Sequence, residues 1–560
     1  MNRSDDLFLS EDFEKLLRES LPDYAADSLL HTLSSGEPAE VSIRLNPSKS
    51  SVAEKDMLSD ASEGGLNDVP EGSSGGVGMA SVFAGAVPWC REACFLKERR
   101  SFTLDPAFHC GAYYVQDSSS MFLSLLVGLI RKTISSGNSN VLDLCASPGG
   151  KSTHLVSLVN SLRTAISPAD STVSSSTANL LESRFSEKLP LVVCNEAVSK
   201  RVPPLTDNIA KWGAANVIVT STSASNLGRL TDFFDVILAD VPCSGEGMFR
   251  KSVDAVSGWS LKGVEECAAL QRSIIEDIWP ALREGGLLVY STCTYNHLEN
   301  GDNVKHIAEE FGAEIAELDD IVSSAIGFAG RKGVVKLPCG YQFVPGLVPG
   351  EGQFFAVLRK RAAQSRSGAG KQKSFGQSGI QKIAGAAEVV FRKHDPSVSR
   401  PGSNLDMDFF YDKSSSIVYM LPSDGKLQER MLKVQQVLGS KEPSCIKMFG
   451  CKVGEIKAGK LIPDADLALN TAMLGAETAR FSVFPSKADK TPVRMEINAV
   501  EVGKETALKF LAKETITPQP EWPRGYVLFA YDSLGLGFVN NLGTRCNNLH
   551  PLHRRIRQNI

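Results

Sequence analysis

Five short apolar segments alternate with stretches of helical pattern between residues 109 and 361. A strand, a helix and a second strand in succession form the unit from which parallel sheets are built. The segments are rich in Val, Ile and Leu, as is typical of strands buried on both faces. They are VLDLC (141–145), LVVCNE (191–196), NVIVTS (216–221), DVILADVP (235–242) and GLLVYSTC (286–293). We therefore predict an α/β domain with a parallel sheet over residues 109–361.

The regions on either side of this domain are predicted to form separate units. Apolar spacing of three and four residues within 7–33 predicts a pair of amphipathic helices, and the strand-like VSIRLNP follows. The glycine-rich segment 48–80 is too polar to bury a core, so we predict a flexible insertion there. The predicted units are an N-terminal domain (1–108), a linker (362–400), an intermediate domain (401–490) and a small β-rich domain (491–560).

The charge balance argues against an overall affinity for polyanions. Sixty basic and 64 acidic side chains give a formal charge of −4, so any nucleic-acid surface must be a local patch. The C-terminal tract holds a basic cluster that fits phosphate contact, and a merely solvated tail is the alternative. This cluster consists of Arg545, Arg554, Arg555 and Arg557, together with His550 and His553.

Cysteine usage and the termini indicate the compartment. The 12 cysteines are scattered without the dense, even spacing of a disulfide framework, which favours free thiols in a reducing environment. The acidic N-terminus lacks a secretory core, and the apolar run 121–130 is far shorter than the roughly 20 residues that span a bilayer. We expect a cytoplasmic monomer without membrane contact and without a metal site.

A glycine pair follows the first apolar segment, in VLDLCASPGGK (141–151), and a helical pattern comes next. Glycines let the backbone pass close to a ligand, and a helix start offers free N–H groups at the edge where open α/β sheets bind cofactors. The motif is neither GxGxxG nor a Walker loop, so dinucleotides and triphosphates are not indicated. Glu196 ends the second segment, where an acid can accept hydrogen bonds from ribose hydroxyls. A plain tight turn and a solvated acid are the alternatives.

Two cysteines follow neighbouring predicted strands. Cys243 lies in DVPCSGEG (240–247), and Cys293 lies in STCTY (291–295). A single cysteine at such a position is more often a small buried hydrophobe than a nucleophile. Because both follow strands that flank the predicted cofactor pocket, we predict that at least one of them is catalytic.

The motifs CASPGGK, NE, DVPCSGEGMFRK and YSTCTY occur here in the order seen in Sun-type (Nop/Fmu-like) RNA cytosine-5 methyltransferases, and the chain resembles that family. SIRLNP, YYVQDSSSM and GEGQFF are supporting matches, and the resemblance covers about residues 41–361. LIPDADLALN and RGYVLFAYDSLGLGFVNNLGTR resemble, less sharply, the PUA-like tail of the bacterial members that modify 16S ribosomal RNA.

The resemblance implies a Rossmann-like class I methyltransferase domain that uses S-adenosylmethionine, with an N-terminal helical and mixed extension and a β-rich PUA-like C-terminal domain. It implies that the Cys293 thiolate adds to C6 of cytosine and that Cys243 assists release of the product. Asp240 would contact the cytosine edge, with Lys151 close to the reacting groups. The implied cofactor-binding residues are Cys145, Ala146, Ser147, Pro148, Gly149, Gly150, Lys151, Glu196, Ser223 and Asp240.

One position departs from the family pattern. Where the family carries an aspartate near the adenine, after the third strand, this sequence has Ser223. A serine hydroxyl can still hydrogen-bond the adenine edge, but without a charge. The substitution implies weaker cofactor binding or a shifted register in that loop.

The leading hypothesis is therefore an RNA cytosine-5 methyltransferase that acts on ribosomal RNA, with transfer RNA as an alternative substrate. A DNA cytosine methyltransferase would use Cys243 as its nucleophile, and STCTY argues against it because that family has no matching Thr-Cys motif. A catalytically silent RNA-binding assembly factor is the third possibility, and Ser223 is its only support.

Overall fold

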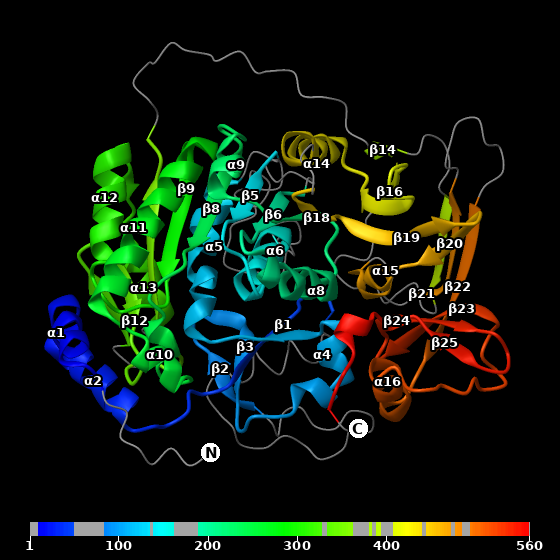
Figure 1. Ribbon diagram of the computed structural model, residues 1–560, viewed down its shortest axis with the longest axis horizontal. Helices are drawn as coiled ribbons and strands as arrows, with labels where there is room; N and C mark the ends of the chain where they lie inside the picture. The colour runs from blue at the N-terminus through cyan, green and yellow to red at the C-terminus, as the bar shows by residue number, and fades with distance from the viewer. Residues whose placement is uncertain are drawn as a thin grey trace, which may run out of the picture.

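The computed structural model describes most of the chain, and its core is an α/β domain (Figure 1). The described residues are 9–49, 83–134, 138–161, 189–326, 333–361, 380–382, 388–393, 407–439, 444–471, 476–483 and 493–558. Most of the predicted insertion and linker lies outside these ranges. No helix within them is long and apolar enough to cross a membrane.

The largest described sheet contains all five predicted strands, in the order β7-β6-β5-β8-β9, and they run parallel. The parallel α/β prediction is thus confirmed. Strand β13 pairs antiparallel with β9 and continues the sheet through β12 and β11. The bounds are β5 Asn140–Asp143, β6 Leu191–Asn195, β7 Val217–Thr220, β8 Phe234–Asp240, β9 Leu282–Thr292, β10 Glu314–Ile315, β11 Val334–Leu337, β12 Gly340–Phe343 and β13 Gln353–Arg359.

Helices cover both faces of this sheet. Apolar side chains of α5, α6 and α8 pack on one face, and those of α9, α11, α12 and α14 pack on the other. Burial on both faces explains why the strand sequences are continuously apolar. The helices are α5 Val127–Thr133, α6 Gly150–Ser161, α8 Val202–Trp212, α9 Ala224–Gly228, α10 Val253–Ser257, α11 Leu261–Ile278, α12 Gly301–Phe311, α13 Asp319–Ile326 and α14 Gly425–Leu438.

The N-terminal region forms the predicted helix pair and a small sheet. Helix α1 (Glu11–Ser20) begins at Ser10, whose side chain accepts a hydrogen bond from Phe13 N, and α2 (Asp23–Ser34) follows. The antiparallel sheet has the order β2-β3-β1-β4. Its strands are β1 Ser42–Leu45, β2 Phe83–Val87, β3 Cys90–Leu96 and β4 Tyr113–Val115, and α4 (Pro106–Cys110) precedes the last.

The C-terminal part contributes two further sheets and an edge strand to the main sheet. Strand β18 (Ile446–Phe449) pairs with β7, so a segment predicted as an intermediate domain extends the α/β sheet. One sheet contains β14 Ile380–Lys382, β16 Met407–Asp412, β17 Ile417–Pro422, β19 Cys451–Lys457 and β20 Lys460–Pro463. The other contains β15 Glu388–Lys393, β21 Ala476–Val483, β22 Val493–Glu501, β23 Gly525–Tyr531, β24 Leu534–Asn541 and β25 Cys546–Asn548, and helices α15 (Ala465–Leu469) and α16 (Lys504–Leu511) accompany these sheets.

The N-terminal sheet and the C-terminal unit share one hydrophobic core. Ile43 and Leu96 of the former pack in the same cluster as Phe510, Val527 and Ile556 of the latter. Helix α4 and the N-terminal sheet, far from the C-terminal unit in sequence, lie beside that unit in Figure 1. The C-terminal unit is therefore held against the rest of the molecule by apolar packing.

The structure corrects part of the predicted basic cluster. The Arg554 side chain is only 10% exposed, and its guanidinium lies 2.8 Å from Asp207 Oδ1 and 2.9 Å from Asp466 Oδ1. His550 is buried, and His553 Nε2 lies 3.2 Å from Asp207 Oδ1. Arg554 and His550 thus face the protein interior rather than a ligand. Arg554 ends the short 3-10 helix Leu552–Arg554, and its guanidinium lies against the two aspartates.

Replacing Arg554 by methionine is expected to lower the free energy of unfolding by about 3 kcal/mol, because two largely buried carboxylates lose their cation. Chemical denaturation followed by tryptophan fluorescence measures this loss. Arg555→Met is the matched control: that neighbouring side chain is exposed, so the change should stay within about 0.5 kcal/mol. Equal losses in the two variants would contradict the assigned role of Arg554.

Candidate active site

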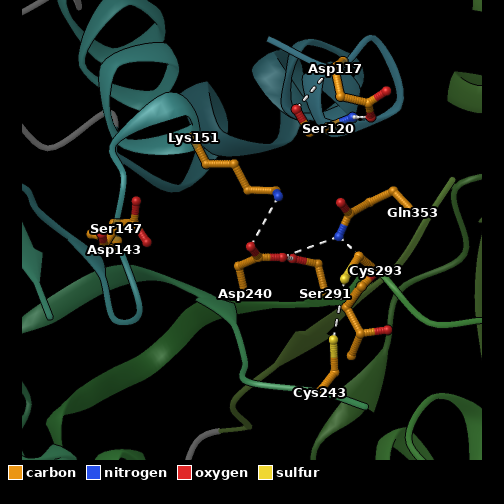
Figure 2. Close-up of polar contacts among 12 residues, drawn as sticks. Asp117, Ser120, Asp143, Ser147, Lys151, Asp240, Cys243, Ser291, Cys293 and Gln353 are labelled. Atoms are coloured by element: carbon orange, nitrogen blue, oxygen red, sulfur yellow. Dashed lines mark hydrogen bonds and ion pairs between the residues drawn. The ribbon is translucent and has the colours of Figure 1, made fainter. Parts of the chain in front are cut away.

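The predicted catalytic side chains meet at the carboxyl end of the parallel sheet. Asp240 ends β8 and is paired in register with Ser291 of β9, and each strand is followed by one of the two cysteines. Lys151 comes from the first turn of α6 and reaches down to Asp240 (Figure 2). Two neighbouring parallel strands and one helix start therefore build this site, as expected at the ligand edge of an open α/β sheet.

The Asp240 carboxylate is held at both oxygens. Lys151 Nζ lies 3.0 Å from Oδ2, and Ser291 Oγ donates to Oδ1 at 2.7 Å. Gln353 Nε2 also donates to Oδ1, at 3.1 Å, and to the carbonyl of Thr292 at 2.8 Å. Ser291 and Gln353 were not predicted as site residues, although both belong to motifs that carry the family resemblance. Their bonds fix the plane of the carboxylate.

Cys243 and Cys293 face each other with their sulfur atoms 3.3 Å apart, within hydrogen-bonding distance, and both thiols are free (Figure 2). The pKa of Cys293 is lowered by the hydrogen bond from Cys243, against the effect of burial. The pKa of Cys243 is raised by the same hydrogen bond and by burial. The pair is therefore asymmetric, and Cys293 is the thiol that ionises first.

Lys151 supports this asymmetry. Burial alone lowers its pKa, but attraction and hydrogen bonding by Asp240 outweigh that effect and leave the pKa raised. The ammonium stays protonated and its charge favours the Cys293 thiolate. The side chain is thus a cation whose charge acts on the Cys293 sulfur.

The predicted cofactor loop joins β5 to α6. Ala146 N donates to the carbonyl of Asn195 at 2.8 Å, and the Ser147 hydroxyl donates to the carbonyl of Arg201 at 2.7 Å. Asn208 Nδ2 donates to the carbonyl of Pro148 at 2.9 Å, and Gly149 has a φ of 113°, which favours glycine. These contacts hold the main chain of the loop close to α8. Cys145 and Gly150 lie at its two ends.

Glu196 has the features of a residue awaiting a hydroxyl donor. It is only 3% exposed, and its Oε1 accepts a hydrogen bond from Val198 N at 2.8 Å. Its Oε2 is buried without a hydrogen-bond partner among the described residues, although Arg201 Nε lies 3.6 Å away. A buried carboxylate oxygen normally has a hydrogen-bond donor. A carboxylate oxygen that can accept a hydrogen bond here fits a ribose hydroxyl, as predicted for an acid at this position.

Asn195, the first residue of the NE motif, was given no role of its own from the sequence, and in the structure it ties strands together. Its Nδ2 donates to the carbonyls of Leu144 and Thr222, and its Oδ1 accepts from Thr220 Oγ1 at 2.8 Å. The amide thereby ties together the ends of β5, β6 and β7. An Asn before an acid at a strand end was the available signal.

Ser223 lies at the start of α9 and is exposed. Its hydroxyl accepts a hydrogen bond from Asn226 N at 3.4 Å and so caps the helix. The same loop is anchored through Thr222, which Asn195 binds at both its N–H and its carbonyl. The serine thus lies in a fixed loop on the cofactor side of the sheet, and its contact with an adenine stays a prediction. In the described part of the chain, no group of His, Cys, Asp and Glu side chains is arranged to hold a metal ion.

Comparison with known families matches two parts of the chain. Residues 174–359 match the family described as 16S rRNA methyltransferase RsmB/F, and residues 497–556 match the methyltransferase RsmF PUA domain. The first match contains Glu196, Asp240 and both active-site cysteines. The second contains most of the C-terminal β-rich unit.

Several bacterial proteins called ribosomal RNA small subunit methyltransferase F are similar over long stretches. The protein of Shewanella loihica is 28% identical over 472 residues, which cover 83% of this chain and 82% of the relative. That of Aliivibrio fischeri is 30% identical over 64% of this chain and 66% of the relative. That of Aeromonas hydrophila is 34% identical over 49% of this chain and 52% of the relative. The first of these alignments extends through most of both proteins.

Solved structures resemble the chain more distantly. NSun6 from Pyrococcus horikoshii is 18% identical with a TM-score of 0.41, covering 63% of this chain and 98% of that one. A methyltransferase homologue from Pyrococcus horikoshii is 22% identical with a TM-score of 0.43, covering 63% of this chain and 96% of that one. Because both scores are below 0.5, the fold description rests on the strand order given above.

Proposed function

Because the chain belongs to the RsmB/F methyltransferase family, we propose that it methylates C5 of a cytosine in 16S ribosomal RNA, with S-adenosylmethionine as methyl donor. The observation that carries this proposal is the pair of free thiols 3.3 Å apart beside the Lys151–Asp240 ion pair. RNA rather than DNA is favoured because Cys293 lies on the Thr-Cys motif, which the DNA cytosine methyltransferases lack, and because the Lys151 charge favours its thiolate. We place the activity in the cytoplasm and in a single chain, which supplies every residue of the site.

Cytosine C5 is too weak a nucleophile to take a methyl group directly. In the proposed mechanism the Cys293 thiolate adds to C6, which makes C5 an enamine carbon. S-Adenosylmethionine supplies the sulfonium methyl group that this carbon takes up. Asp240 lies where it can bind the cytosine edge, and Ser291 and Gln353 hold its carboxylate in place. A base then removes the C5 proton, the C5–C6 double bond re-forms, and Cys293 leaves as the thiolate.

Cys243 is placed to assist that last step. Its thiol keeps its proton, because its pKa is raised by the hydrogen bond to Cys293 and by burial. A protonated thiol 3.3 Å from Cys293 can stabilise the departing thiolate by hydrogen bonding. The two cysteines therefore divide adduct formation and release between them.

The β5–α6 loop and the end of β6 are the proposed cofactor site. Main-chain groups of residues 145–150 line the turn, and the unpartnered Oε2 of Glu196 would accept from a ribose hydroxyl. Ser223 would contact the adenine edge as a neutral group. Lys151 and Asp240 lie between this loop and the thiols and would border the methyl group.

Glu196→Gln is expected to weaken S-adenosylmethionine binding by about 10- to 100-fold, because an amide cannot accept from two ribose hydroxyls as a carboxylate can. Isothermal titration calorimetry measures this change. Glu276→Gln on α11 removes the same charge from an exposed position and should leave binding unchanged. Wild-type affinity in the Glu196 variant would contradict the ribose assignment.

Exposed cations on the loop after β3 and on the C-terminal segment are the proposed RNA contacts. Ser101 Oγ donates to Gln558 Oε1 at 3.3 Å, so the loop after β3 lies against the terminal segment. Lys97, Arg99 and Arg100 are exposed on the loop, and Arg555 and Arg557 are exposed on the terminal segment. Arg44 of β1 donates to the carbonyl of Gly150 at 3.2 Å, which links this sheet to the cofactor helix. An RNA held here would be placed in a fixed relation to Cys293.

Two double variants test this surface: Arg99→Gln with Arg100→Gln, and Arg555→Gln with Arg557→Gln. Each is expected to reduce RNA affinity about tenfold. The slope of log affinity against log salt concentration should fall by about 1 for each cation removed. Filter binding with protein-free 16S ribosomal RNA over a salt series measures both. Lys262→Gln with Lys305→Gln, on α11 and α12 at the left of Figure 1, is the control pair. An unchanged slope in the arginine variants would contradict the assignment.

The direct test of the substrate is bisulfite mapping of 16S ribosomal RNA from cells with and without this chain. One cytosine that resists bisulfite conversion should become convertible when the chain is absent. Expression of the wild type should restore its resistance, and expression of Cys293→Ala should not. Loss of a cytosine signal in transfer RNA instead would favour that substrate. Calorimetry tests the silent assembly factor, which would bind RNA but no S-adenosylmethionine.

A further inference from the structure

Two buried carboxylates lie beneath the cysteine loops, outside the residues given a chemical role above. Glu246 and Glu299 are each about 1% exposed or less. The amide of Asn296 donates to both, at 2.8 Å to Glu246 Oε1 and at 2.9 Å to Glu299 Oε1. The three side chains form one connected network under the site.

Each carboxylate holds a different cysteine loop. Glu299 Oε2 accepts from Ser244 N at 3.0 Å, which fixes the main chain directly after Cys243. Glu246 Oε2 accepts from Tyr295 N at 2.7 Å, two residues after Cys293. Gly247 N donates to the carbonyl of Cys293 at 2.8 Å and joins the two loops directly.

Glu299 is also held by Gln271 of α11. Gln271 Nε2 donates to its Oε2 at 2.7 Å and to the carbonyl of Pro242 at 2.9 Å. Gln271 is itself fixed, because its Oε1 accepts from Tyr290 Oη at 2.8 Å. The position of the Cys243 loop is therefore set by a chain of buried hydrogen bonds on α11, β9 and the loop before α12.

The charges around the two sulfurs differ. On the Cys293 side lie the Lys151 cation, the Asp240 and Glu246 carboxylates and the Tyr295 phenol. On the Cys243 side lie the Glu299 carboxylate and the Tyr290 phenol. A negative charge near a thiol disfavours its thiolate. Glu299 thus opposes ionisation of Cys243 in particular.

We propose that Glu299 is the positioning residue that divides the work between the two cysteines. Its carboxylate fixes the Cys243 loop through Ser244 N and keeps the proton on Cys243, so that Cys243 donates a hydrogen bond and Cys293 is the thiolate. This assignment rests on the proposed function, in which Cys293 is the nucleophile. Glu299 is fully buried and acts through the Cys243 loop.

Differential alkylation tests the proposal without RNA or cofactor. The full chain is treated with iodoacetamide at pH 7, and the modified fractions of Cys243 and Cys293 are measured by peptide mass spectrometry. The wild type should modify Cys293 at least tenfold faster than Cys243. In Glu299→Gln the ratio should fall about tenfold, because Cys243 loses its opposing charge and its fixed position. Glu299→Asp keeps the charge and should recover part of the ratio.

Glu246→Gln is the matched control, because it removes an equally buried carboxylate that Asn296 also binds. Its loss should keep or increase the Cys293 preference, since Glu246, whose pKa is raised to about 7 by burial, disfavours the Cys293 thiolate where it is ionised. An unchanged ratio in Glu299→Gln would overturn the proposal, and so would an equal fall in Glu246→Gln, which indicates general loosening. If Glu299→Gln does not fold, a wild-type ratio in Glu299→Asp at every pH from 6 to 9 would overturn it. Methylation of 16S ribosomal RNA is measured in a separate assay. Loss of that activity in the wild type would contradict the proposed function without changing the alkylation ratio.

Discussion

Replacement of Cys293 by alanine should reduce methylation on the order of 10⁴-fold or more, because no other group in the site can form the bond to C6. The nearest thiol, Cys243, keeps its proton, because its pKa is raised by the hydrogen bond to Cys293 and by burial. Transfer of a radioactive methyl group from S-adenosylmethionine to 16S ribosomal RNA measures the loss. The variant should still bind both S-adenosylmethionine and RNA.

The control for this experiment is Cys267→Ala, which removes a half-buried thiol on α11. It should keep wild-type methylation. Retained activity in Cys293→Ala, with loss in Cys243→Ala, would assign the nucleophile to the Pro-Cys cysteine, as in the DNA cytosine methyltransferases. That result would require a different origin for the asymmetry of the thiol pair, because Lys151 favours a thiolate at Cys293.

The sequence predicts the central fold well because its strands are buried on both faces. Continuous apolar runs such as LVVCN and DVILAD have no other stable position in a chain of this composition, and all five became adjacent parallel strands. The same topology brings strand ends to one edge, so the meeting of Cys243, Cys293 and Asp240 follows from local motifs. Long-range geometry adds little at these positions.

The residues that sequence reasoning missed act through distant partners. Glu299 follows Cys293 by a few positions, but its role depends on Ser244 and on Gln271, which lie on other elements. Gln353 reaches Asp240 only because β13 pairs antiparallel with β9. No local pattern in the sequence indicates such contacts.

The C-terminal arginines show the same limit. The charge count placed Arg554 and Arg555 in one cluster, but Arg554 faces Asp207 and Asp466 while Arg555 is exposed. Arg554 ends a 3-10 helical turn (Leu552–Arg554) and Arg555 follows it, so the two side chains leave the main chain in different directions. Which side faces inward is decided by the shared core around Ile556, and composition cannot predict that.

Cys243→Ala should accumulate a covalent adduct between the protein and its RNA. Cys293 can still add to C6, but the thiol that assists its departure is gone. Two effects are expected to combine. Adduct formation should slow several-fold, because the hydrogen bond that lowers the pKa of Cys293 is lost, and release should slow far more.

Denaturing gel electrophoresis with labelled 16S ribosomal RNA measures the adduct. The Cys243 variant should convert most of the protein to a slowly migrating band after one turnover, while the wild type shows only a trace. Cys243→Ala combined with Cys293→Ala should abolish the band, because the bond is formed by Cys293. A band that persists in the double variant would place the covalent bond on another residue. If the single variant turned over normally, release would depend on water or Lys151 rather than on Cys243.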